Sequence, residues 1–167
     1  LDRRDAGFAT ALTYGTLRLR GRYDAMIAAC TDRPLERIDA AVLDVLRLGA
    51  HQLMGMRVAQ HAAVSTTVDL ATTSCGRGAA TFVNAVMRRL SGRDLDSWMA
   101  VLRRDAPDET AALARTQSHP EWIVKALRQA LVTHGRSGEE LEALLAADNA
   151  DPEVALCARP GLIAPEA

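Results

Sequence analysis

The sequence predicts an all-α protein, and three observations support this fold class. Of the 167 residues, 49% are hydrophobic but only 4% are aromatic, so the core must be filled by Leu, Val, Ile and Met, which suits packed helices. Apolar residues recur at intervals of three and four along most of the chain. Glycine, proline and capping residues divide it into helix-length segments. The length fits one ordinary domain with part of a second attached.

The first expected helix runs from Arg4 to about Cys30. Its apolar stripe consists of Phe8, Ala11, Leu12, Gly15 and Leu19. We expect Gly15 to let another helix approach closely. Gly21 is expected to mark a bend or a restart.

The second expected helix begins after Asp32 and Pro34, with Glu36 in the first turn, where the helix dipole favours an anion. Its apolar band consists of Leu35, Ile38, Val42, Val45, Leu46, Gly49 and Leu53, and its polar side of Glu36, Arg37, Asp44, Arg47 and His51. Leu43 and Leu48 widen the band, so this helix is expected to be central and buried on most of its circumference.

Two helices follow, from about Ala62 to Ser74 and from about Arg77 to Leu90, and "CGRG" separates them. The first buries Val64, Val68 and either Leu70 or Ala71. The second carries Phe82, Val83, Val86 and Leu90 on one face. Its opposite face is a polar stripe, as regular as the apolar one, of Arg77, Thr81, Asn84 and Arg88.

Two short helices are expected next, one around Leu95 to Leu102 and one after Pro107. "SHPE" predicts a capping box between Ser118 and Glu121, and a second box joins Ser137 to Glu140. The helix after the first box is expected to bury Trp122, Ile123, Leu127 and Leu131. "EVALCARPG", after Pro152, alternates like a strand, so it is expected to belong to a sheet outside this sequence.

The known catalytic motifs are missing from the sequence. It holds no G-x-G-x-x-G, Walker A, G-x-S-x-G or H-E-x-x-H pattern. The four histidines are isolated, and Cys30, Cys75 and Cys157 are too far apart for a zinc motif or a disulfide framework. No apolar run reaches a membrane span, and no signal peptide is present. We therefore expect a soluble cytoplasmic chain with no metal and no catalytic residue of its own, and its first residue, Leu1, suggests a longer gene product.

Charge is distributed unevenly along the chain. The net charge of −1 is the balance of +5 over residues 1 to 104 and −6 over the remainder. Arginine dominates the positive charge, which suits bidentate phosphate contacts. The candidate RNA-binding residues are Arg3, Arg4, Arg18, Arg20, Arg22, Arg77, Arg88 and Arg89. The alternative is that these arginines are scattered on solvated helices or stabilise helix ends.

Three strings carry a family resemblance: "RDAGFATALTYGTLR" from Arg4, "RLGAHQLMGMRVAQHAAVSTTVDLA" from Arg47 and "FVNAVMRRL" from Phe82. Together they resemble the NusB-like domain at the N-terminus of bacterial 16S ribosomal RNA cytosine-C5 methyltransferases, the Sun or Fmu family. "SHPEW" is similar to the junction where those enzymes enter their methyltransferase portion. The chain departs from the family at Ala59 and Gln60, where a proline is usual, and at Thr67, where a glutamate is frequent.

The resemblance implies an all-α, NusB-like helical bundle over residues 1–117. Residues 118–167 would be a helical junction and a first strand leading into a missing methyltransferase portion. That portion would use S-adenosylmethionine, whereas this chain would hold no cofactor. The family's glycine loop and its two catalytic cysteines have no counterpart here, because Cys157 in "LCARP" matches neither context. No catalytic residue is therefore carried over.

Three functions remain open from the sequence. The first is a noncatalytic region that binds and positions 16S rRNA for the C-terminal catalytic domain of the same chain. The second is a stand-alone NusB-like transcription antitermination factor that acts through protein and RNA contacts. The third is a docking module that packs on its catalytic neighbour and binds no RNA.

Overall fold

The structure, a computed structural model, describes residues 2–151, and in this part of the chain helices joined by loops are the only regular secondary structure, without a strand. The α-helices are α1 (Arg3–Arg18), α2 (Arg20–Ala28), α3 (Ala40–Met54), α4 (Gln60–Cys75), α5 (Arg77–Leu90), α6 (Leu95–Arg104), α7 (Glu109–Thr116), α8 (Glu121–Thr133) and α9 (Leu141–Asp148). Two short 3-10 helices are η1 (Leu35–Arg37) and η2 (Gly138–Glu140). The predicted all-α fold is confirmed. The predicted strand and Cys157 lie outside the described residues.

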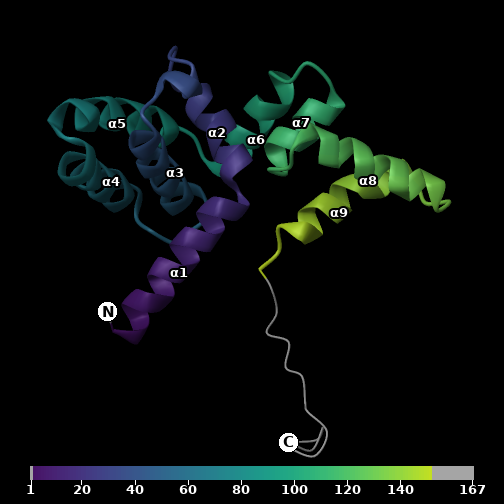
Figure 1. Cartoon of the computed structure of the whole chain (residues 1–167), viewed down its shortest axis with the longest axis horizontal. Coiled ribbons are helices and arrows are strands. Elements are labelled where there is room, and N and C mark those ends of the chain that lie inside the picture. The colour runs from purple at the N-terminus through teal and green to yellow at the C-terminus, as the bar shows by residue number, and fades with distance from the viewer. Residues whose placement is uncertain (1, 152–167) are drawn as a thin grey trace, which may run out of the picture.

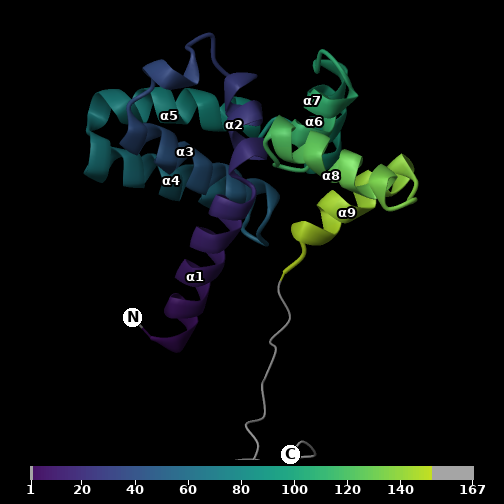
Figure 2. The same cartoon turned by 45° about the vertical axis from the view of Figure 1, so that its right-hand side comes forward.

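Helix α3 lies at the centre of a bundle formed with α1, α2, α4 and α5, as the sequence predicted (Figure 1). Helices α6 to α9 form a second group beside it. Both views show the first half of α1 projecting away from the bundle (Figure 2). Residues 3–11, at the start of α1, are all exposed.

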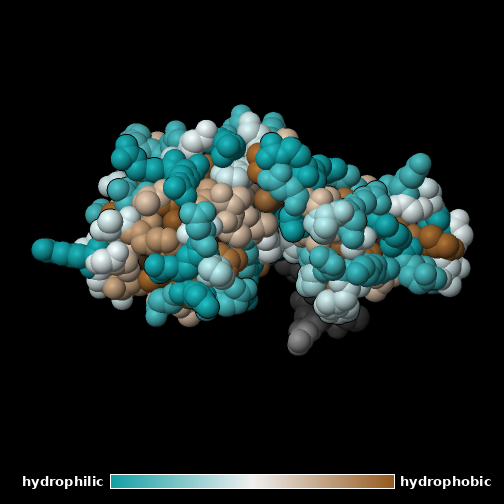
Figure 3. Space-filling model, turned by 90° about the horizontal axis from the view of Figure 1, so that it is seen from above, coloured by the Kyte–Doolittle hydropathy of each residue, from teal (hydrophilic) through white to brown (hydrophobic). Residues whose placement is uncertain are grey.

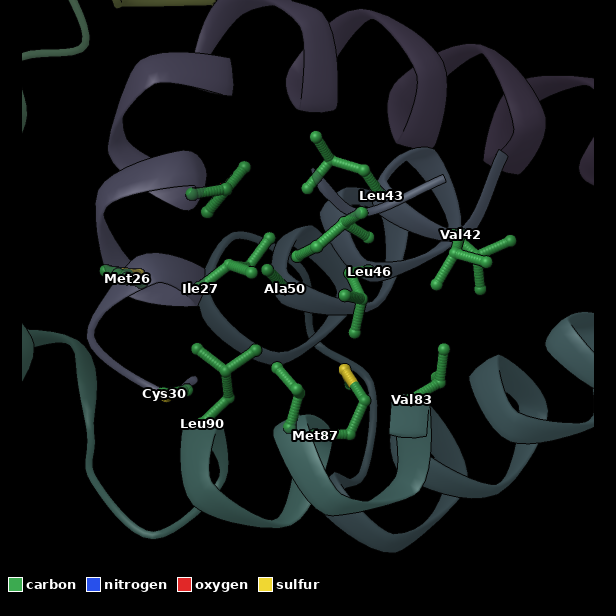
Figure 4. Packing of buried hydrophobic residues seen from close by; sticks show 14 of the residues in the cluster. Met26, Ile27, Cys30, Val42, Leu43, Leu46, Ala50, Val83, Met87 and Leu90 are labelled. Carbon is green, nitrogen blue, oxygen red and sulfur yellow. The ribbon is translucent and has the colours of Figure 1, made fainter. Parts of the chain in front are cut away.

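The main hydrophobic core draws its largest side chains from α2, α3, α5 and α6. Figure 4 shows the packing of those from α2, α3 and α5. Fully buried members include Met26, Ile27, Leu46, Leu90 and Trp98. Burying a side chain of this size stabilises the fold by about 1.5–3 kcal/mol relative to leaving it exposed. A smaller cluster of Leu113, Ala114, Val124, Leu141 and Leu145 holds α7, α8 and α9 together. The predicted domain boundary at residue 117 lies within this second group and stays a prediction.

Glycines allow three helices, α1, α4 and α5, to approach α3 closely. A Cβ added at Gly49, in α3, would lie 2.7 Å from side-chain atoms of Thr67 in α4 and Met87 in α5. A Cβ added at Gly15, in α1, would overlap the imidazole ring of His51. The close approach predicted at Gly15 is therefore confirmed.

The ring of His51 is buried between α1, α2 and α3, so its predicted place on the polar side of its helix is wrong. Its Nδ1 atom lies 2.7 Å from the hydroxyl of Tyr23, which is also buried. Burial lowers the pKa of His51, the carbonyl of Ala11 opposes this effect, and the charge of Arg18 adds to it. The neutral imidazole thus fills the space that the missing side chain of Gly15 leaves.

Three further local predictions need correction. The helix predicted to begin near Leu35 begins at Ala40, because the carboxylate of Asp39 accepts from the backbone amides of Ala41 and Val42 and caps it there. Trp122, which was expected to be buried, is 68% exposed, and Phe8, on the predicted apolar stripe, is 46% exposed, since the described residues place no helix over either of them. The first predicted helix is broken at Leu19, two residues before Gly21.

Ser118 caps a helix other than the one predicted. Its φ of 56° is left-handed, and the next helix, α8, begins after Pro120 with no side-chain cap. Its hydroxyl instead accepts from the backbone amides of Gly21 at 2.9 Å and Arg22 at 3.3 Å, in the first turn of α2. The predicted capping box at Ser118 is therefore wrong, whereas the box at Ser137 and Glu140 is confirmed.

A substitution at Gly15 tests the crossing of α1 and α3. Gly15→Ala is expected to lower the free energy of unfolding by about 1–3 kcal/mol, because the new methyl group overlaps His51. Gly7→Ala is the control, since it lies in the same helix with nothing within 4 Å of its added Cβ. It should stabilise by up to about 1 kcal/mol. Denaturant unfolding measures both, and equal effects would contradict the close approach.

The buried His51 predicts a loss of stability in mild acid. Above pH about 6.5 the imidazole is neutral in both the folded and the unfolded chain. Below that value the unfolded chain takes up a proton that the buried ring resists, so the free energy of unfolding falls, by up to about 1.4 kcal/mol per pH unit. Between pH 7.5 and pH 5.5, the free energy of unfolding should change less for His51→Gln than for the unsubstituted chain. His134→Gln, at an exposed site, should retain the difference of the unsubstituted chain.

Candidate functional site

The eight predicted RNA-binding arginines do not form one cluster. Arg3 and Arg4 lie on the projecting start of α1. Arg77 and Arg88 belong to opposite ends of α5, about 16 Å apart along its axis. The positive charge is therefore spread over several helices.

Arg18 and Arg22 connect the bundle to the second group of helices. Arg18 lies 2.6 Å from a carboxylate oxygen of Asp151 and donates to the carbonyl of Asn149 at 3.2 Å. Arg22 is half-buried, and its Nε atom donates to the carbonyl of Thr116 at 2.7 Å. Burial lowers the pKa of Arg22, but an arginine keeps its charge in proteins.

Arg89 makes a hydrogen bond within the fold, whereas Arg20 makes only one long ion pair among residues 2–151. Arg89 donates to the carbonyl of Cys30, at the end of α2, at 2.8 Å. Arg20 lies 3.7 Å from Asp24, but that carboxylate makes two shorter bonds to Arg47. Arg20 thus keeps a side chain that is 60% exposed.

Five of the eight arginines are left available to a partner: Arg3, Arg4, Arg20, Arg77 and Arg88. Arg18, Arg22 and Arg89 already bind carbonyl groups of the chain, so a phosphate would have to use their remaining donors. RNA contact stays a prediction for all eight.

A groove of about 600 Å³ runs between α4 and α5 and places one of these arginines beside other polar groups. We call it the α4–α5 groove. It is lined by Gln60, His61, Val64, Ser65, Val68, Asp69, Asn84, Arg88 and Ser91.

The groove forms because α4 and α5 are antiparallel neighbours. Gly76, with a φ of 90°, reverses the chain between them. The amide of Gln60 donates to the carbonyl of Ser91, which fixes the start of α4 against the end of α5. Arg88 therefore lies toward the start of α4, and Asn84 lies further along it.

Five polar side chains of the groove have no hydrogen-bond or ion-pair partner among residues 2–151. They are His61, Ser65, Asp69, Asn84 and Arg88. Hydroxyls elsewhere in α4 behave differently, since those of Thr67 and Thr72 bond to carbonyls one turn back. The unpaired groups can therefore bind a ligand without first breaking an internal bond.

Sequence reasoning found only part of this groove. Asn84 and Arg88 belong to the polar stripe recognised on α5, and Arg88 was a predicted RNA ligand. His61, Ser65 and Asp69 were missed, because their alignment with that stripe depends on the pairing of two helices. The polar positions of α4, spaced by four residues, were the available signal.

The described residues contain no group of three or more His, Cys, Asp or Glu side chains that could hold a metal ion. Within the same range, no helix has both the length and the hydrophobicity that crossing a membrane requires. Burial raises the pKa of the Cys30 thiol to about 11, so this cysteine is not a reactive thiolate.

The family model described as the NusB family matches residues 1–92, which cover α1 to α5 and the groove between the last two. The chain belongs to the NusB family. The comparison with solved structures gives no match to it.

Curated relatives of this NusB-family chain are longer proteins. "Putative methyltransferase Rv1407" of Mycobacterium tuberculosis is 48% identical over 161 residues, which are 96% of this chain and 35% of the relative. "Ribosomal RNA small subunit methyltransferase B" of Pseudomonas putida is 34% identical over 156 residues, 93% of this chain and 33% of the relative. The chain thus spans about a third of the length of these relatives.

Substitutions at Arg22 and Arg20 test whether an arginine bound to a backbone carbonyl stabilises this NusB-family chain more than an exposed arginine does. Arg22→Gln removes a charged donor from the carbonyl of Thr116 and is expected to lower the free energy of unfolding by about 1.5–3 kcal/mol. Arg20→Gln should change it by less than about 0.5 kcal/mol, because the side chain is largely exposed. Urea denaturation measures both variants. Equal losses of stability in the two variants would contradict a structural role for Arg22 that Arg20 lacks.

Proposed function

We propose that the chain is the noncatalytic, RNA-contacting region of a larger 16S rRNA cytosine-C5 methyltransferase. The observation that carries this proposal is the similarity over 93% of the chain to a protein named ribosomal RNA small subunit methyltransferase B. The exposed arginines on α1, α2 and α5 support it, since arginine binds phosphate through paired donors. The proposal implies a cytoplasmic protein, because its substrate is ribosomal RNA.

S-adenosylmethionine would bind outside the described residues. A loop that holds a nucleotide-like cofactor usually follows a strand and opens a helix, and residues 2–151 form no strand. The described residues therefore do not fit this cofactor, and no step of methyl transfer is assigned to them. Their part would be to attract the RNA and to hold it for a catalytic domain in the same chain.

The alternative function is a stand-alone NusB-like antitermination factor. The family match favours it as well, because the match concerns only the NusB portion. The length of the relatives favours the methyltransferase, since the region shared with this chain is only 35% and 33% of the two relatives described above. The third function, a docking module, predicts that the chain binds no RNA even at low salt.

The salt dependence of RNA binding tests the proposed function. The logarithm of the binding constant for a single-stranded 16S rRNA fragment should fall with the logarithm of salt concentration. Glutamine at positions 3, 4, 20, 77 and 88 should reduce that slope by about 0.7 for each arginine that contacts a phosphate. The measurement is a filter-binding titration at several salt concentrations.

The control replaces arginines that are already paired. Arg104 binds Asp105 and Arg136 binds Glu140, so glutamine at both positions should leave the slope nearly unchanged. No binding by the unsubstituted chain at low salt would remove the RNA role and leave the docking module.

A further inference from the structure

The two ends of the α4–α5 groove differ in chemistry. At the end near His61, α4 begins with Ala59 as its N-cap, which offers no side-chain bond to the amides of the first turn. Arg88 lies toward the same end. Free helix amides and a guanidinium both favour an anion such as a phosphate.

The other end carries acceptors instead. The carboxylate of Asp69 can only accept hydrogen bonds, and among residues 2–151 nothing donates to it. The amide of Asn84, half-buried, adds both a donor and an acceptor. From His61 to Asp69 the helix rises about 12 Å, which leaves room for a nucleotide between the two ends.

We propose that the α4–α5 groove binds one unpaired RNA nucleotide whose base carries an exocyclic amino group. The phosphate lies at Arg88 and the start of α4, and the amino group donates to Asp69. Carboxylates recognise the amino group of cytosine in this manner. Uracil presents a carbonyl oxygen at the same place, which the carboxylate repels. The inference rests on the proposed function and deepens it by naming what the groove selects.

The composition of the groove favours a nucleotide over a protein segment. Only two of its lining side chains, Val64 and Val68, are apolar, and both are already partly buried against the core. A docking helix or strand would need an apolar centre of large side chains, which two partly buried valines do not provide. Unpaired polar groups with a cation at one end and an anion at the other match a nucleotide, whose phosphate accepts and whose amino group donates.

Two labelled RNA oligomers of nine nucleotides, all-cytidine and all-uridine, test this inference by fluorescence anisotropy with the whole chain at pH 7.5. Both carry the same phosphates, so the exposed arginines attract them equally. The cytidine oligomer is expected to bind at least about fivefold more tightly than the uridine oligomer. This factor is the lower end of the discrimination that one side-chain contact to a base provides. Asp69→Asn should bring the ratio close to about one, and Arg88→Gln should weaken both oligomers without changing it.

Asp96→Asn, an exposed carboxylate on α6, is the matched control and should keep the preference of the unsubstituted chain. Circular dichroism and thermal unfolding check that each variant is folded. If both oligomers bind equally and Asp69→Asn has no effect, the inference is overturned while RNA contact stands. If neither binds at low salt, the inference and the proposed function are both overturned.

Discussion

The constraint on which the rest of the structure depends is the burial of α3 on nearly all sides. Eight of its residues are buried, and they face α1, α2, α4 and α5 in turn. Gly49 and Gly15 permit this coverage, because a side chain at either position would collide with a neighbour. Each surrounding helix must turn one face inward to α3. Its opposite face is then left for other contacts, and the groove between α4 and α5 lies on such an outer side.

The two helical groups are held to each other by directional polar contacts as well as by packing. Ser118 caps α2, Arg22 binds the carbonyl of Thr116, and Arg18 binds the carbonyl of Asn149. All three join the α1–α2 junction to the end of α7 or to the residues just after α7 or α9. Figure 3 shows one face of the molecule, seen from above, where hydrophilic residues cover much of both groups and hydrophobic residues appear in patches. The bonds from Arg22 and Arg18 are partly buried and end on backbone carbonyls, so they favour one orientation of the two groups.

The features that the sequence predicts correctly are those set by local periodicity. The central place of α3 and the two faces of α5 follow from apolar residues on a period of 3.6. The start of α3, set by its Asp39 cap, and the break at Leu19 are local errors, whereas the others concern long-range partners. Ser118 and Glu121 fit a local capping rule, but the amides of α2 compete for the same hydroxyl. Trp122 fits an apolar stripe, yet no described helix covers it. His61, Ser65 and Asp69 become neighbours of α5 only when two helices pair, which no periodicity within one helix reveals.

If the proposed function holds, the spread of positive charge suits a region that works while joined to a catalytic domain. Five available arginines on separate helices attract phosphates from several directions, but such contacts carry no sequence information. A single polar groove adds a local contact with a defined direction. On the proposed function, both domains bind one RNA, so the second contact occurs at an effective concentration set by the covalent link. Modest affinity in each part is then sufficient, and no single large basic cluster is required.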